Sequence, residues 1–175
     1  MCGVFSYQRG KLRQTLNDKN FIPKKYVSGG RAFFLSKVSG NKIILRHQVS
    51  VRMVGAMLCD VPYAYKTGKF VRQGTTFKPR VGMPLRYGKS HKALKGLTVY
   101  KNASCKSKKF TIKKGQKVKF TKLYVKGSRI ALQVKVGKKT GWIKCASSAK
   151  SGLLVKSSDP WVPRMPPFKG LQMAG

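Results

Sequence analysis

The stretch KKFTIKKGQKVKFTKLYVKGSRIALQVKVGKKTGWIK, from Lys108 to Lys144, decides the fold of this chain. Apolar residues alternate with basic residues along it, and glycine-containing turns interrupt the alternation at short intervals. Alternation with a period of two is typical of half-buried β-strands. The stretch contains no acidic residue, so the solvent-facing side of the predicted sheet carries positive charge without an internal counterpart.

Five short strands are predicted between residues 96 and 145, with turns at Lys-Lys-Gly-Gln, Lys-Gly-Ser and Gly-Lys-Lys. Residues 130, 132, 134 and 136 are apolar and face one way, while residues 129, 131, 133 and 135 face the other. A bulge near Thr121–Lys122 reconciles the two apolar parities of the preceding strand. Five bent strands in about fifty residues favour a small closed barrel, which leaves no exposed strand edge.

Three sequence features carry a resemblance to a known family: the opening VYK, the KKGQKV turn, and the closing GKKTGWIK with Gly-Trp-Ile-Lys at residues 141–144. With these features residues 94–147 resemble a bacterial SH3-type (SH3b) domain. The resemblance implies an SH3-like barrel. Because SH3b domains often bind bacterial cell wall, it also implies wall binding as one functional alternative. Residues 1–93 resemble no known family.

The rest of the chain divides by composition. Residues 1–25 read as an extended basic arm that orders only against a partner. Residues 26–93 alternate short β-branched and aromatic runs with turn signals, and they predict an antiparallel β region followed by a linker at Lys89–Gly96. Residues 148–175 form a Pro-rich, extended tail. The predicted fold class is therefore all-β: arm, N-terminal β-rich domain, SH3-like barrel of residues 94–147, and tail.

The charge balance is the most informative feature of the composition. The chain has 175 residues with 39 Lys plus Arg against 3 Asp plus Glu, a formal net charge of +36. Like-charge repulsion opposes compaction when so few internal salt bridges are available. We therefore predict a polyanionic partner, either nucleic acid contacted mainly at its phosphate backbone or acidic surfaces of neighbouring subunits. Membrane contact is compatible with the charge but nothing else indicates it.

Basic side chains in the arm, on the predicted strands and in the turns are the candidates for polyanion binding. Arginine supplies 8 of the 20 basic residues before residue 96 and 2 of the 19 after it. Its planar group suits bidentate phosphate contact, so the first half is predicted to make the more specific contacts. The candidate residues are Arg9, Lys11, Arg13, Lys24, Lys25, Arg46, Arg52, Arg72, Arg80, Arg86, Lys113, Lys114, Lys117, Lys119, Arg129, Lys135, Lys138 and Lys139.

Catalytic chemistry lacks its ingredients. The four cysteines lie far apart without a CxxC pair, so no metal site and no cofactor is predicted. A hydrolase would need Cys59 with His47 or His91, but the apolar context of Cys59 favours a buried thiol. Whether Cys105 and Cys145 pair stays open, as does whether Trp142 stacks on bases or packs beside the core. No catalytic residue and no small-molecule substrate are expected, and neither a signal peptide nor a transmembrane segment is visible.

The tail offers a second kind of contact. Trp161, Met165 and Phe168 lie in a proline-rich segment where large apolar side chains would be poorly placed in water. They are predicted to dock on a neighbouring subunit, with folding back onto the chain's own barrel as the alternative.

Taken together, the residues favour a non-enzymatic structural subunit of a large nucleic-acid-containing particle. A virion minor capsid or core protein is preferred, located in a virion or intracellular particle. A ribosomal or mitoribosomal RNA-binding protein is the first alternative. An SH3b-type cell-wall-binding module is the second.

Overall fold

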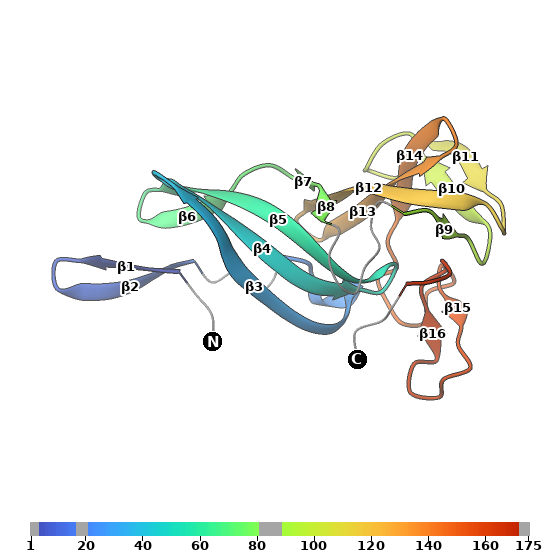
Figure 1. The fold of residues 1–175 in the computed structure, drawn as a ribbon, viewed down its shortest axis with the longest axis horizontal. Coiled ribbons are helices and arrows are strands. Elements are labelled where there is room, and N and C mark those ends of the chain that lie inside the picture. The colour runs from blue at the N-terminus through green and yellow to red at the C-terminus, as the bar shows by residue number, and fades with distance from the viewer. Residues whose placement is uncertain (1–3, 17–20, 81–88, 172–175) are drawn as a thin grey trace.

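The structure is a computed structural model that describes residues 4–16, 21–80 and 89–171 (Figure 1). Across these ranges the chain forms antiparallel sheets, one 3-10 turn (η1, Lys24–Tyr26) and no α-helix. The all-β prediction is confirmed.

The N-terminal residues form a hairpin and not the extended arm that the sequence predicts. Strands β1 (Val4–Gln8) and β2 (Lys11–Leu16) pair through a turn at Arg9 and Gly10, both with positive φ (50° and 73°). A two-residue turn with positive φ at both positions has a backbone twist that matches the right-handed twist of the paired strands. After the hairpin, Phe21 and Ile22 are fully buried in the core. Phe21 and Ile22 thus find partners within the chain, whereas Phe5, Tyr7 and Leu12 of the hairpin are exposed.

The N-terminal sheet has the order β3-β4-β5-β6, with β8 paired to the other end of β5. Its strands are β3 (Val27–Ser39), β4 (Lys42–Val51), β5 (Gly55–Lys66), β6 (Lys69–Arg72) and β8 (Pro79–Arg80). The tight turn at Gly40–Asn41 joins β3 to β4, where Ser-Gly-Asn predicts it. Val49, Val51 and Met53 are buried, as their alternation indicates.

The C-terminal sheet has the order β11-β10-β14-β13-β12-β7, and β9 also pairs with β12. Its strands are β7 (Thr76–Phe77), β9 (His91–Lys92), β10 (Leu97–Tyr100), β11 (Lys108–Ile112), β12 (Lys117–Lys126), β13 (Arg129–Val136) and β14 (Lys139–Lys144). The predicted bulge is present, since the register between β12 and β13 shifts between Phe120 and Lys122. Alternation then buries residues 130, 132 and 134 against the core.

The closed barrel expected for residues 94–147 does not form in the described part of the chain. The outer edge of β12 pairs with β7 and β9, which come from residues before 94. That edge is therefore occupied, and β11 and β12 are not paired with each other. Residues 76–77 and 91–92 thus belong to the C-terminal sheet, although the sequence places them in the N-terminal domain.

The tail packs on the same sheet. Ala93 forms a bridge with Phe168, and the Lys169 N–H donates to the Lys92 carbonyl at 2.8 Å. Strands β15 (Val155–Lys156) and β16 (Arg164–Met165) form a small hairpin before this point. The Phe168 ring is 1% exposed and meets Phe120 edge-to-face at 4.9 Å between centroids. Phe168 therefore folds back into the chain's own core and is not free to dock on a neighbour.

One apolar core joins the two sheets. Phe21 contacts His47 of the N-terminal sheet and Phe77 of the C-terminal sheet, with centroids 4.5 and 5.3 Å apart. The β1–β2 hairpin lies at one end of the long axis of the molecule and the C-terminal sheet at the other (Figure 1).

Candidate nucleic-acid interface

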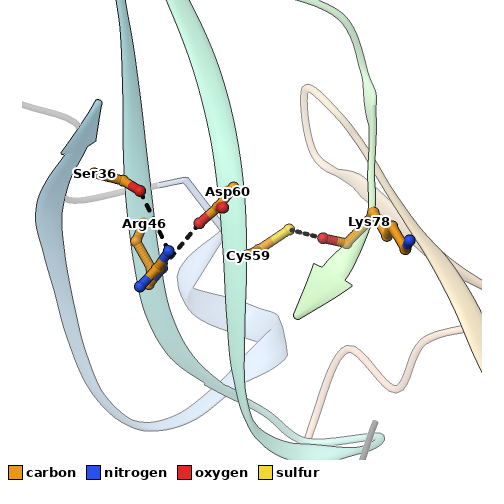
Figure 2. A network of polar contacts seen from close by, with 5 residues as sticks. All are labelled: Ser36, Arg46, Cys59, Asp60 and Lys78. Atoms are coloured by element: carbon orange, nitrogen blue, oxygen red, sulfur yellow. Dashed lines mark hydrogen bonds and ion pairs between the residues drawn. The ribbon is translucent and has the colours of Figure 1, made fainter. Parts of the chain in front are cut away.

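Two of the three carboxylates are held by contacts within the chain. Arg46 Nε lies 3.0 Å from Asp60 Oδ1, and its Nη2 donates to Ser36 Oγ at 3.2 Å (Figure 2). Asp159 Oδ1 accepts the Trp161 N–H at 2.9 Å. Asp18 lies outside the described residues. These acids leave nearly all of the 39 cations without an internal carboxylate.

Several predicted arginines of the first half have contacts within the chain or are half-buried. Arg46 bridges β4 and β5 through the ion pair with Asp60. The Arg72 guanidinium lies 5.5 and 5.8 Å from the ring centroids of Phe21 and Phe77, a cation–π arrangement. Arg52 is half-buried, and its Nε has no hydrogen-bond partner among the described residues. Arg46 and Arg72 therefore already have partners within the chain.

The other predicted cations lie at the surface wherever the structure describes their side chains. The Arg80 side chain and the whole of Arg86 lie outside the described residues. The exposed side chains are Arg9, Lys11, Arg13, Lys24, Lys25, Lys113, Lys114, Lys117, Lys119, Arg129, Lys135, Lys138 and Lys139.

Strand register places cations directly opposite cations. On β12, Lys117 is opposite Lys92, Lys119 is opposite Lys135, and Lys126 is opposite Arg129. The same occurs for Lys66 with Lys69 and for Lys156 with Arg164. All ten side chains are exposed. Like charges directly opposite in a sheet destabilise it, so these five pairs are a cost of the free chain that a bound anion would remove.

The solvent-facing side of β12, β13 and β14 combines charge with aromatic surface, and we call it the outer sheet face: Lys119, Lys122, Tyr124, Lys135 and Trp142. Trp142 is opposite Gln133, which is opposite Lys122. Tyr124 meets Trp142 edge-to-face, with centroids 6.1 Å apart. Both rings are half-exposed, so each offers part of its surface to a ligand while its remaining surface packs on the sheet.

Lys122 and Tyr124 were not among the sequence candidates. The bulge at Phe120–Lys122 shifts the parity of β12, and simple alternation before the bulge does not place these residues beside Lys119. Both residues can be identified from the sequence if the change of parity at the bulge is applied to the rest of the strand.

Cys59 and His47, the pair that a hydrolase would need, are core residues. The two residues are opposite each other on β4 and β5, and both are buried. The Cys59 thiol donates to the Lys78 carbonyl at 3.7 Å, and His47 Nε2 lies 3.1 Å from the Tyr63 hydroxyl (Figure 2 shows the thiol contact). Burial, and next the charge of Asp60, raise the pKa of Cys59 to about 12. The nucleophilic thiolate is thus disfavoured at neutral pH.

Cys59, Cys105 and Cys145 are free thiols. Burial raises the pKa of Cys145 well above its ordinary value, and the nearby Cys105 adds to the rise. Within residues 4–16, 21–80 and 89–171, no group of three His, Cys, Asp or Glu side chains is placed to hold a metal ion. The same residues contain no helix of the length and apolarity needed to cross a membrane.

The chain matches no protein-family model, no curated protein and no solved structure. The SH3b resemblance of residues 94–147 therefore stays a prediction.

Proposed function

We propose that this chain is a structural, non-enzymatic subunit of a large nucleic-acid-containing particle, a virion minor capsid or core protein. It binds the phosphate backbone through the outer sheet face and the neighbouring basic turns. The observation that carries the proposal is the set of five cation–cation pairs across adjacent strands.

The energetics favour a polyanion over scattered counterions. Each opposed cation pair destabilises the free sheet by an amount on the order of 0.2–1 kcal/mol. Phosphates placed between the pairs remove this repulsion and release condensed counterions from the nucleic acid. Binding thus relieves a repulsion that folding alone leaves in place.

The chemistry of the face supports backbone contact without sequence reading. Lysine acts as a mobile point charge, and the outer sheet face carries Lys119, Lys122 and Lys135. No helix is present in the described residues to enter a major groove. Tyr124 and Trp142 add ring surface on which unpaired bases can stack, at roughly 1–3 kcal/mol per base.

Exposed apolar side chains support a role inside an assembly. Trp161 is 92% exposed and Tyr7 is 73% exposed, and Leu12 and Leu35 are exposed by more than half. Such residues on a soluble surface mark contacts with other proteins when they cluster, as Tyr7 and Leu12 do in directly opposed positions on β1 and β2.

The test is the salt dependence of binding to single-stranded and duplex nucleic acid, measured by fluorescence anisotropy. Replacing Lys119, Lys122 and Lys135 together by Gln should lower the salt slope by about two to three units, because each phosphate contact contributes roughly 0.7–0.9. The matched control replaces Lys37, Lys42 and Lys78, which are also exposed and belong to none of the five opposed pairs, by Gln. It should change the slope less.

Two results would overturn the proposal. One is a folded wild-type chain that binds neither nucleic acid at low salt. The other is specific binding to purified cell wall in preference to nucleic acid, which would favour the SH3b-type alternative. If cryo-electron microscopy located the chain in a ribosome, the proposed binding chemistry would stand. The proposed particle would then be a ribosome and not a virion.

A further inference from the structure

A cleft of about 350 Å³ lies where four segments distant in sequence meet. Its lining comes from η1, from the loop before β11, from the turn between β12 and β13, and from the end of β14. Four of the lining residues are cations: Lys25, Lys106, Arg129 and Lys144. None of the described residues that line the cleft carries a carboxylate. We call the four cations and their surroundings the basic cleft.

The path of the backbone, and not only the length of the side chains, brings these cations close to one another. Arg129 and Lys144 lie on adjacent strands, and Lys144 is opposite Ala131, two residues from Arg129, so the two cations are diagonal neighbours. Lys25 Nζ lies 5.4 Å from the ring centroid of Tyr26, a cation–π contact between two residues that line the cleft. A compact positive site assembled from four segments is a built feature of the fold.

The remaining lining is suited to an anion. Ser128 contributes a hydroxyl donor, whereas the Ser104 hydroxyl already donates to Asn102 Oδ1. The Ser104 N–H donates to Asn102 Oδ1 at 3.2 Å, and Cys105 has a left-handed backbone with φ 55°. Non-glycine residues adopt that conformation only where the surroundings hold them, and such positions concentrate at ligand sites.

Tyr26 and Cys105 are the two side chains of the cleft that could become negatively charged. Both stay protonated, so neither repels an anion. Burial raises the pKa of Tyr26, and burial raises the pKa of Cys105 against the opposing effect of Lys144 and Arg129. Both side chains are therefore neutral at physiological pH and add no negative charge to the cleft.

We infer that the basic cleft binds a terminal phosphate group, a mono-, di- or triphosphate, and so recognises the end of a nucleic-acid strand. An internal phosphodiester carries one negative charge, whereas a terminal phosphate carries about −1.5 to −2 at neutral pH and a triphosphate more. Four converging cations match the larger charge. The inference deepens the proposed function, and it rests on that function for the nucleic-acid source of the phosphate.

The experiment compares one RNA oligonucleotide, labelled at its 3′ end, with a 5′-triphosphate, a 5′-monophosphate or a 5′-hydroxyl. Binding to the full chain is followed by fluorescence anisotropy. The triphosphate form should bind roughly tenfold more tightly than the hydroxyl form, since several charge-assisted hydrogen bonds are added. The preference should be lost when Lys106 and Lys144 are both replaced by Gln, with circular dichroism confirming the fold.

The control is Lys119→Gln with Lys135→Gln on the outer sheet face. That variant should weaken all three oligonucleotides by the same factor and retain the end preference. Inorganic tripolyphosphate is the second probe. If tripolyphosphate competes away only the end preference, the cleft inference is supported. If tripolyphosphate binds saturably but the oligonucleotides show no end preference, the cleft is a site for free oligophosphate.

The outcomes separate the two proposals. Equal binding of the three oligonucleotides with no tripolyphosphate binding overturns the cleft inference and leaves the proposed function intact. Absence of any oligonucleotide binding overturns the proposed function, and the tripolyphosphate titration alone then decides the cleft. An end preference that survives in the Lys106 and Lys144 variant also overturns the cleft inference.

Discussion

The N-terminal and C-terminal sheets place their cations differently. In the N-terminal sheet, Arg46 pairs with Asp60, and Arg72 packs over aromatic rings. In the C-terminal sheet, Lys119 and Lys135 oppose each other at the surface with no acid nearby in the sequence. The arginine-rich half thus engages two of its guanidinium groups within the chain, whereas the lysine-rich half leaves opposed lysines at the surface.

This difference bears on which half contacts phosphate. The abundance of arginine before residue 96 predicts the first half, because guanidinium suits bidentate contact. The geometry favours the C-terminal sheet instead, because three of the described arginines of the first half already have contacts within the chain or are half-buried. Residue type is a guide to phosphate binding only where the side chain is free to reach the phosphate.

The largest expected effect concerns how the C-terminal sheet is completed. Phe168→Ala should lower the free energy of unfolding by about 3–5 kcal/mol, because it empties a fully buried site beside Phe120. Urea denaturation measures the change. Trp161→Ala is the matched control in the same tail, and its 92% exposure predicts a change within about 0.5 kcal/mol. A larger loss for Trp161→Ala would mean that the tail packs differently.

The next effect tests the close approach of β10 and β14. A Cβ added at Gly141 would overlap Val99 Cγ1 and would lie 2.8 Å from the Tyr100 carbonyl oxygen. Because one of these atoms is backbone, Gly141→Ala should cost about 1–3 kcal/mol in unfolding free energy. Gly152→Ala has no atom within 4 Å and serves as the control. Equal stability of the two variants would contradict the described packing of β10 on β14.

The third effect uses the buried thiol of the N-terminal sheet. The pKa of Cys59 is raised to about 12, so the folded chain holds this proton more tightly than the unfolded chain. The stability from the neutral thiol is complete below the ordinary thiol pKa of 9.0 and is lost as the pH rises toward 12.

The stability difference between wild type and Cys59→Ala should therefore shrink by up to about 1.4 kcal/mol per pH unit above about pH 9. Comparing two variants cancels the titration of the many lysines. Denaturation at several alkaline pH values gives the difference. A constant difference would show that the Cys59 thiol titrates as it does in the unfolded chain.

The smallest effect on stability is the sharpest test of the opposed cations. Lys135→Glu turns the Lys119 pair into an opposite-charge pair, so it should stabilise the free chain by about 0.2–1 kcal/mol at low salt. The same change should weaken nucleic-acid binding. Lys138→Glu, in the turn after β13, changes the net charge equally without an opposed cation and should give the smaller stabilisation. Loss of stability in Lys135→Glu would remove the repulsion on which the proposed function depends.

Much of the secondary structure could be predicted, and for a clear reason. Alternation from Lys117 to Val136 determines which residues are buried, and the conflict of parity within the strand predicts the bulge at Phe120–Lys122. Turn residues such as Gly40 mark where strands reverse. These are local properties, since each depends on a few neighbouring residues.

The errors fall where distant segments meet. The strands β7 and β9, two residues each, carry too little pattern to be assigned, yet they occupy the edge of β12 and prevent the barrel from closing there. The basic cleft was missed for the same reason: Lys106 and Lys144 share no spacing or motif, and only the meeting of four segments unites them.

By itself the sequence determined that this chain is β-rich and strongly cationic, because alternation and charge are summed along the chain. Tertiary structure decided which cations are opposed, which arginines find partners within the chain and where the tail returns. Those outcomes depend on register and on contacts between residues far apart in sequence, which no local pattern encodes.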